Sequence, residues 1–204
     1  MYLPQILNLS VSDYTKIENA LNKDDLQWKS TSKYYKWNIS ATTDPATLGF
    51  KKCDQRLDCS VCAHSTNSTG HTCNSTGEKF PINSSLSCLT PWVVYSVSCD
   101  KGSGQCAQAK GPQYIGCSER PFKKRFSEHL GTVTQPCHKD TVKPVGAHFR
   151  LPGHDHSDMI ALPIEKIRTR CRFVMEARER FWIKNYNSVK LLTVEEIESG
   201  LNMK

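Results

Sequence analysis

The cysteines and histidines are the residues of this 204-residue chain best suited to chemistry, ten and seven in number. Thiolates and imidazoles are the usual ligands of zinc, whereas many cysteines in a secreted chain would indicate disulfides. Five N-x-S/T sequons favour the secreted interpretation, but the opening residues, MYLPQILNLSVSDYTK, lack the features of a signal peptide. We therefore expect metal binding in an intracellular, reducing compartment, either nuclear or cytoplasmic.

A first zinc-ligand pattern lies before the middle of the chain. Cys59 and Cys62 form a C-x₂-C pair, which is the spacing typical of a zinc knuckle. Cys53 and Cys88 would complete four ligands, with His64 as the alternative to one of them. Free thiols in a flexible segment are the competing interpretation.

Positive charge is concentrated in one segment. The net charge is +7, and residues 110–184 carry fifteen Lys or Arg against eight Asp or Glu. A basic face suits a polyanion such as nucleic acid. A solvated surface with no ligand is the alternative. No run approaches the roughly 20 apolar residues of a membrane span, which argues against a membrane protein.

Three segments are interpreted as β-strands, the first of them because β-branched and aromatic residues dominate it. The first two are separated by a Gly-rich stretch, which predicts a hairpin with a long connection. The three strands are expected at residues 92–99, 113–117 and 159–167.

Two further segments have helical periodicity. SERPFKKRFSEHL begins at Ser118, a suitable N-cap, and its apolar residues recur every fourth position. Arg125 and His129 lie four residues apart and so share one face of this helix. A longer helix is predicted from Phe173 to Asn187, with Glu179 on its polar side. Shorter helices are expected within residues 11–21 and 141–154.

Five of these residues occur in the order of a known family. They are Tyr95 on the first strand, Tyr114 of Tyr-Ile-Gly, Arg125 and His129 of R-x-x-x-H, and Glu179 of RERFWIK. This order resembles a GIY-YIG nuclease domain, and it is most similar to the endonuclease of Penelope-like retroelements. The first motif here reads VVY, without the family's glycine, and the spacer between the tyrosine motifs is longer than usual.

The resemblance implies an α+β fold in which helices flank a small, mainly antiparallel three-stranded sheet. We expect a helical or irregular lead-in over residues 1–50 and a loop-rich, cysteine-rich linker without a hydrophobic core over 51–90. The nuclease domain would occupy residues 91–204. The implied partner is DNA, with a reverse transcriptase domain or element RNA as further partners.

The implied reaction is metal-dependent hydrolysis of a phosphodiester bond, which nicks target DNA. It requires an activated water, neutralised phosphate charge and assistance to the leaving oxygen. Glu179 matches the family's single metal-binding glutamate, and a hard carboxylate suits Mg²⁺ or Mn²⁺. Glu176, one turn earlier, is the alternative ligand.

The remaining residues have expected roles around the phosphate. Arg125 would clamp the phosphoryl oxygens with its forked guanidinium. Tyr95 would take or relay the proton of the attacking water, with positive charge supplied by Arg125 and His129. Tyr114 would orient the water or the phosphate.

A second zinc set is expected inside the nuclease domain. Cys99, Cys106, His148 and His154 supply two thiolates and two imidazoles, a closed and therefore structural set. The resembling endonucleases place a cysteine pair and a histidine pair in the same order. In the alternative interpretation His148 contacts phosphate and the cysteines are free. Three cysteines have no visible partner in the sequence: Cys117, Cys137 and Cys171.

Two other functions remain open at this stage. A zinc-containing DNA-binding module whose nuclease is inactive would keep the same basic face and metal ligands. A secreted disulfide protein would have few free thiols and no zinc.

Overall fold

A computed structural model of the chain describes residues 47–53, 59–101, 106, 113–135 and 143–186. It also gives the backbone of two short strand pairs, β1 (Trp28–Lys29) with β2 (Lys36–Trp37) and β10 (Val189–Lys190) with β11 (Asn202–Met203). The helix expected within residues 11–21 lies outside the described residues. None of the helices in the described part of the chain combines the length and apolar composition of a membrane span.

A three-stranded antiparallel sheet forms the centre of the molecule. Its strand order is β8-β7-β9, with β7 at Val93–Cys99, β8 at Gln113–Ser118 and β9 at Met159–Lys166. Both neighbours pair antiparallel with β7, and Tyr95 lies opposite Gly116 on β8. The prediction of an α+β fold with a small antiparallel sheet is confirmed.

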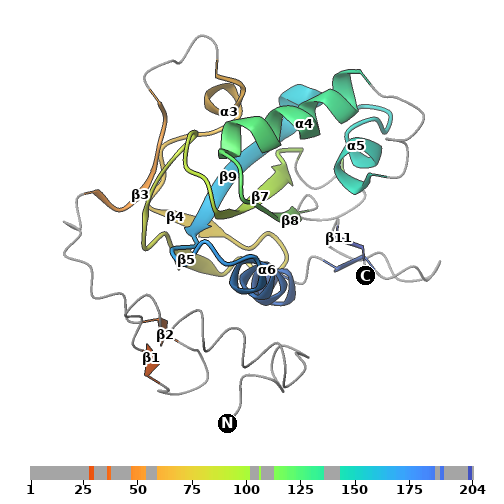
Figure 1. Ribbon diagram of the computed structural model, residues 1–204. Coiled ribbons are helices and arrows are strands. Elements are labelled where there is room, and N and C mark those ends of the chain that lie inside the picture. The colour runs from red at the N-terminus through yellow and green to blue at the C-terminus, as the bar shows by residue number, and fades with distance from the viewer. Residues whose placement is uncertain are drawn as a thin grey trace.

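Helices cover both faces of this sheet (Figure 1). On one face lie α4 (Phe122–Thr134) and the short α5 (Pro144–His148), and Phe122 and Phe126 share a buried core with Tyr95. On the other face lies α6 (Arg172–Tyr186), whose apolar side shares a second core with Val94 and Ile115. Successive strand residues point to opposite faces, so the two helices pack against alternate residues of the same strands.

The start of α4 differs from the expectation. The helix begins at Phe122, and the Ser118 side chain bonds the backbone of Arg120 instead of capping the helix. The first N–H groups of α4 are satisfied by the preceding segment: Phe122 N donates to Thr90 O at 3.1 Å and Lys123 N to Cys88 O at 2.8 Å. Backbone carbonyls of the preceding segment therefore satisfy these N–H groups in place of a side-chain cap.

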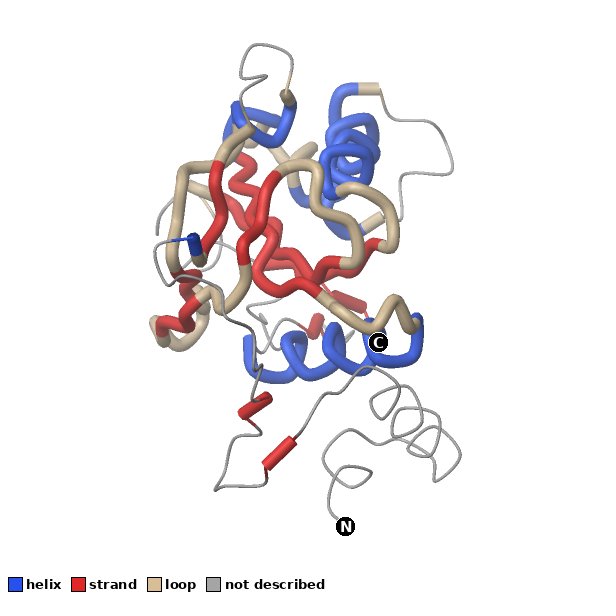
Figure 2. The backbone as a smooth tube through the Cα atoms, turned by 60° about the vertical axis from the view of Figure 1, so that its left-hand side comes forward, coloured by secondary structure: helices blue, strands red, loops and turns tan. Residues whose placement is uncertain are grey.

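The cysteine-rich segment packs against the sheet and does not form a coreless linker. Phe50, Val61, Ile82 and Leu86 are buried in the same core as β7, which corrects the expectation for this segment. Its short elements lie beside the central sheet (Figure 2). They are β3 (Gly49–Lys51) parallel to β6 (Ser85–Ser87), β4 (Gly70–Thr72) antiparallel to β5 (Lys79–Pro81), and α3 (Ser60–Ala63).

A one-turn 3₁₀ helix, η3 (His156–Asp158), leads into β9. The side chain of Asp155 caps it by accepting from Ser157 N at 2.6 Å. Backbone bonding between Asp100 N and Asp158 O, at 2.8 Å, joins this turn to the end of β7. The ends of β7 and β9 are thus held together next to the loop that carries Cys106.

Candidate active site and metal centres

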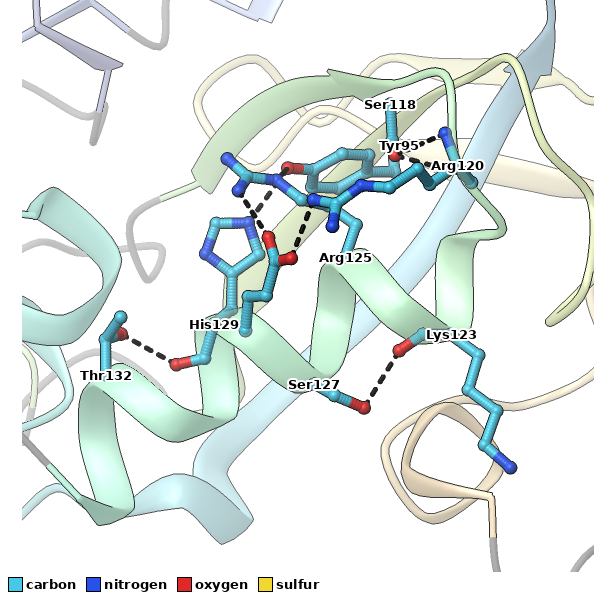
Figure 3. A network of polar contacts seen from close by, with 9 residues as sticks. Tyr95, Ser118, Arg120, Lys123, Arg125, Ser127, His129 and Thr132 are labelled. Atoms are coloured by element: carbon cyan, nitrogen blue, oxygen red, sulfur yellow. Dashed lines mark hydrogen bonds and ion pairs between the residues drawn. The ribbon is translucent and has the colours of Figure 1, made fainter.

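A buried tyrosine is the centre of the candidate active site. The side chain of Tyr95 is fully buried on β7, and its hydroxyl contacts two residues of α4 (Figure 3). Arg125 Nε donates to the hydroxyl oxygen at 3.0 Å, and His129 Nε2 lies 2.8 Å from the same oxygen. The one-turn spacing of Arg125 and His129 brings both to one phenol, as the sequence predicts.

Protonation in this group follows from burial. Burial, and then the charge of Arg125, lower the pKa of His129 to about 3. Burial, and then Tyr114, raise the pKa of Tyr95 well above its ordinary value, although Arg125 opposes this shift. Tyr95 is therefore a neutral phenol, and it shares a hydrogen bond with a neutral His129 ring. The second positive charge that was expected from His129 is absent, and Arg125 is the cation of the group.

The guanidinium of Arg125 is held from a second side as well. Its Nη1 donates to Glu128 at 2.9 Å, and Glu128 also pairs with Arg120 at 2.6 Å. Glu128 lies on an exposed part of α4, so these ion pairs are accessible to solvent. Sequence reasoning did not single out Glu128, because acidic residues three positions from an arginine are common on helix surfaces.

Tyr114 lies beside the phenol at the wall of a cavity. Its ring centre is 6.3 Å from that of Tyr95 and 5.4 Å from that of His129. The cavity has a volume of about 260 Å³ and is also lined by Arg125 and Lys143. Its charged lining is two cations and one carboxylate, Glu128, which leaves a positive balance suited to an anion. Lys143 is a lining residue that sequence reasoning missed.

The glycine of Tyr-Ile-Gly is required by packing. A Cβ placed on Gly116 would lie 2.5 Å from the Tyr95 hydroxyl and 2.7 Å from Cε1 of Tyr114. Neither ring can retreat without disturbing the hydrogen bonds of the phenol. The Gly116 position therefore admits both tyrosines to one face of the sheet.

Glu179 reaches the same region from the opposite helix. Burial raises its pKa, whereas hydrogen bonds from the thiol and backbone N–H of Cys117 act against that shift. After burial, the charge of Glu179 is among the causes that raise the pKa of Tyr114, so the two residues interact. Cys117, which has no visible partner in the sequence, is a direct partner of Glu179.

The alternative carboxylate is engaged elsewhere. Glu176 accepts from Arg172 Nε at 2.7 Å in an i,i+4 ion pair on the exposed side of α6. The two glutamates of this helix thus have different environments: one is bound to β8, and the other is paired at the surface.

The first predicted zinc set is brought together by the fold. The ligand atoms of Cys53, Cys59, Cys62 and Cys88 all lie within 4.8 Å of one another. Cys62 Sγ is 3.6 Å from Cys53 Sγ and 3.4 Å from Cys88 Sγ. These distances exceed an S–S bond and approach the roughly 3.8 Å between sulfurs that bind one tetrahedral zinc.

His64, the alternative fourth ligand, points elsewhere. Its Nδ1 lies 3.1 Å from the carbonyl oxygen of Met159. The geometry therefore favours the four-cysteine set. All nine cysteines in the described part of the chain are free thiols, which gives no support to the disulfide interpretation within those residues.

The second predicted set also forms a cluster. Cys99, Cys106, His148 and His154 place their ligand atoms within 4.8 Å of one another. Cys106 Sγ lies 3.8 Å from His148 Nε2. The Nε2 of His154 is buried without a hydrogen-bond partner, while its Nδ1 lies 3.4 Å from the Pro152 carbonyl. A ring oriented by one nitrogen, with the other unused, is the arrangement of a metal-binding histidine.

Both clusters could hold a metal ion such as zinc, because four thiolate or imidazole donors converge in each. Comparisons of the chain with protein-family models, with curated proteins and with solved structures gave no match.

Proposed function

We propose that the chain is a metal-dependent DNA endonuclease of the GIY-YIG type that nicks target DNA for a Penelope-like retroelement or a derivative of one. The observation that carries this proposal is the hydrogen-bonded group of Tyr95, Arg125 and His129, because Arg125 and His129 also line the cavity beside the buried phenol. The partnership with a reverse transcriptase domain or element RNA stays a prediction.

The geometry suggests a path for the proton of the attacking water. The water would give its proton to the Tyr95 oxygen while the phenol passes its own proton to His129 Nε2, 2.8 Å away. His129 is neutral at rest, and the tautomer that carries its proton on Nδ1 would accept it at Nε2. A bound phosphate would favour the resulting imidazolium, because a nearby negative charge raises the pKa of a histidine.

Positive charge at the cavity would hold the phosphate. Arg125 is fixed by Tyr95 and Glu128, so its orientation is set before any ligand binds. Preorganised charge of this kind stabilises the charge that develops in the transition state. Lys143, which lines the same cavity, would add to it.

Glu179 fits the divalent ion that the resemblance implies. Its raised pKa means that burial leaves the carboxylate charge incompletely compensated, so a cation bound there would relieve a cost already present. One carboxylate and several waters are a common ligand set for Mg²⁺ or Mn²⁺. When bound, the ion would supply Lewis-acid stabilisation of the leaving oxygen. The two Cys/His clusters would hold structural zinc.

A plasmid-nicking assay with Mg²⁺ and with Mn²⁺ tests this function. We expect Glu179→Ala to abolish nicking, by a factor of at least ~10³, while DNA binding persists. Glu176→Ala is the matched control, because it removes a carboxylate from the same helix one turn earlier. Equal activity of the two variants would refute the role of Glu179. Binding without nicking by the unmodified protein would instead indicate an inactive DNA-binding module.

A further inference from the structure

A second cavity lies away from the Tyr95 group, where β7 begins and β9 ends. Its volume is about 470 Å³. The strand order places it on the β9 side of the sheet, whereas Cys117 and Glu179 meet at the β8 edge. Six of the lining residues carry polar or aromatic groups: Ser84, Ser85, Trp92, Lys166, Arg168 and Arg170.

Three exposed cations dominate this cavity. Lys166, Arg168 and Arg170 occupy every second position of the chain, and Ile167, between the first two, is buried. Within the described part of the chain no acidic residue lines the cavity, and none of these cations forms an ion pair. Exposed positive charge without a protein partner is suited to a polyanion.

Glu165, the carboxylate nearest to these cations in the sequence, is bound by side chains of α6. Both oxygens of Glu165 accept from Arg178 Nε, at 2.9 and 3.0 Å, and one also accepts from Trp182 Nε1 at 2.5 Å. Glu165 therefore neutralises a cation of α6, and the charge of Lys166 next to it remains available.

The backbone at this cavity is strained at two positions. Among the described non-glycine residues, positive φ occurs only at Trp92, at 54°, and at Arg170, at 44°. Both residues line this cavity. The carbonyl of Trp92 is held by Ile167 N at 2.7 Å. Strain of this kind at bulky residues tends to occur at functional sites, where it presents a side chain to a ligand.

We propose that this cavity binds a single strand of nucleic acid, with phosphates on Lys166, Arg168 and Arg170 and a base against the half-buried indole of Trp92. Cations that follow a backbone beside an aromatic face are the usual means of holding single strands. The assignment rests on the proposed function only in taking nucleic acid as the polyanion. It adds an anchoring site separate from the point of cleavage.

Fluorescence anisotropy with labelled oligo(dT) and oligo(U), without added Mg²⁺ or Mn²⁺ so that cleavage is prevented, tests the charges. For Lys166→Gln/Arg168→Gln/Arg170→Gln we expect binding at least ~10-fold weaker. We also expect the slope of log Kd against log salt to fall by about 2, at roughly 0.7 for each phosphate that no longer meets a cation. Arg172→Gln is the control, because Glu176 already pairs with Arg172. An unchanged slope in the triple variant would overturn the proposal.

Further variants keep the test decisive. Trp92→Leu should weaken binding about tenfold with an unchanged salt slope, since it removes the stacking of one base but no charge. If it has no effect and inorganic polyphosphate competes as well as oligo(dT), the cavity is only an anion surface and the strand assignment is wrong. Should the triple variant unfold, Arg168→Gln alone should show about one third of the decrease in slope.

The two arms also separate this proposal from the proposed function. Loss of oligonucleotide binding in the triple variant of a protein that never nicks DNA would support the cavity and refute the endonuclease. If the triple variant still nicks DNA and binds oligonucleotides as before, the endonuclease is supported and the strand-binding cavity is refuted. The oligo(U) arm shows whether the strand is DNA or RNA, and a protein that bound neither would overturn the assignment.

Discussion

The hydroxyl of Tyr95 links Arg125 and His129 through hydrogen bonds. Arg125 donates to the oxygen of Tyr95, and the same oxygen shares a hydrogen bond with Nε2 of His129. Helix periodicity predicted that Arg125 and His129 share a face, and the family resemblance implied that Tyr95 joins them. Neither predicted the neutral state of His129, since burial depends on how closely α4 packs against the sheet.

The titration of His129 checks this arrangement. Its folded pKa of about 3 lies below the unfolded value of about 6.5. Folding therefore favours the neutral ring, and the stability from this site is present above pH 6.5 and lost as the pH falls toward 3. In NMR spectra the His129 ring signal should show no titration between pH 5.5 and 8. A midpoint near that of a free histidine peptide would contradict the buried geometry.

Glu179 should cost stability when no metal is bound. Its pKa is raised, chiefly by burial. The charged form is therefore disfavoured by folding, and stability falls as the pH rises from about 4.5 through the folded pKa. We expect Glu179→Gln to raise the Tm at pH 7.5 in buffer without added Mg²⁺ or Mn²⁺, by about 2–4 °C for each kcal/mol relieved. The advantage should vanish near pH 4.

The response to metal completes that prediction. Added Mg²⁺ should raise the Tm of the unmodified protein, because a ligand of the folded state stabilises it. The Gln variant should not respond. Identical responses of the two proteins would show that the ion binds elsewhere. The partnership of Glu179 with Cys117 was not predictable from the sequence, because nothing local identifies an edge-strand N–H as the one that meets α6.

At the scale of elements, α4 is held at both ends by segments that supply metal ligands. Its first N–H groups donate to the carbonyls of Cys88 and Thr90, next to the four-cysteine cluster. Its last turn contacts the histidine-bearing segment, where Arg150 Nη1 donates to Thr132 O at 3.1 Å. Donor types and order predicted both ligand sets, but the sequence left open whether His64 replaces Cys53 or Cys88, whether the thiols are free, and whether His148 contacts phosphate.

Metal analysis tests the two clusters independently. We expect two zinc ions per chain in the unmodified protein and one in each of Cys62→Ser and His154→Ala. Each loss should lower the Tm by about 10 °C or more, since zinc binding energy is folding energy. Cys171→Ser is the control, because Cys171 belongs to neither cluster. Unchanged zinc content in both cluster variants would show that these residues bind no metal.

At the scale of the whole molecule, the described residues are organised by what covers the central sheet. The two buried cores lie on its two faces, and the first contains residues from both sides of position 90. The outer edge of β9 is bound by the cysteine-rich segment, where Ala161 N donates to His64 O at 2.8 Å. The sequence did not predict this packing, because the segment is rich in Ser, Thr and Asn. A few apolar residues are enough to attach a segment to a core that other elements form.

This shared core predicts how the molecule unfolds. If residues 51–90 were an independent module, heating would give two transitions, and chelating zinc would abolish the earlier one alone. With Phe50, Val61 and Leu86 in the core of β7, we expect these parts to unfold together. Scanning calorimetry should then show one transition for the sheet and the cysteine-rich segment, with equal calorimetric and van't Hoff enthalpies.

Leu86→Ala probes the coupling, since a buried leucine truncation costs about 2–5 kcal/mol. It should lower the midpoint of that single transition, reported equally by Trp182 fluorescence in α6 and by zinc release. Zinc release that precedes the fluorescence change would show that the cysteine-rich segment unfolds independently.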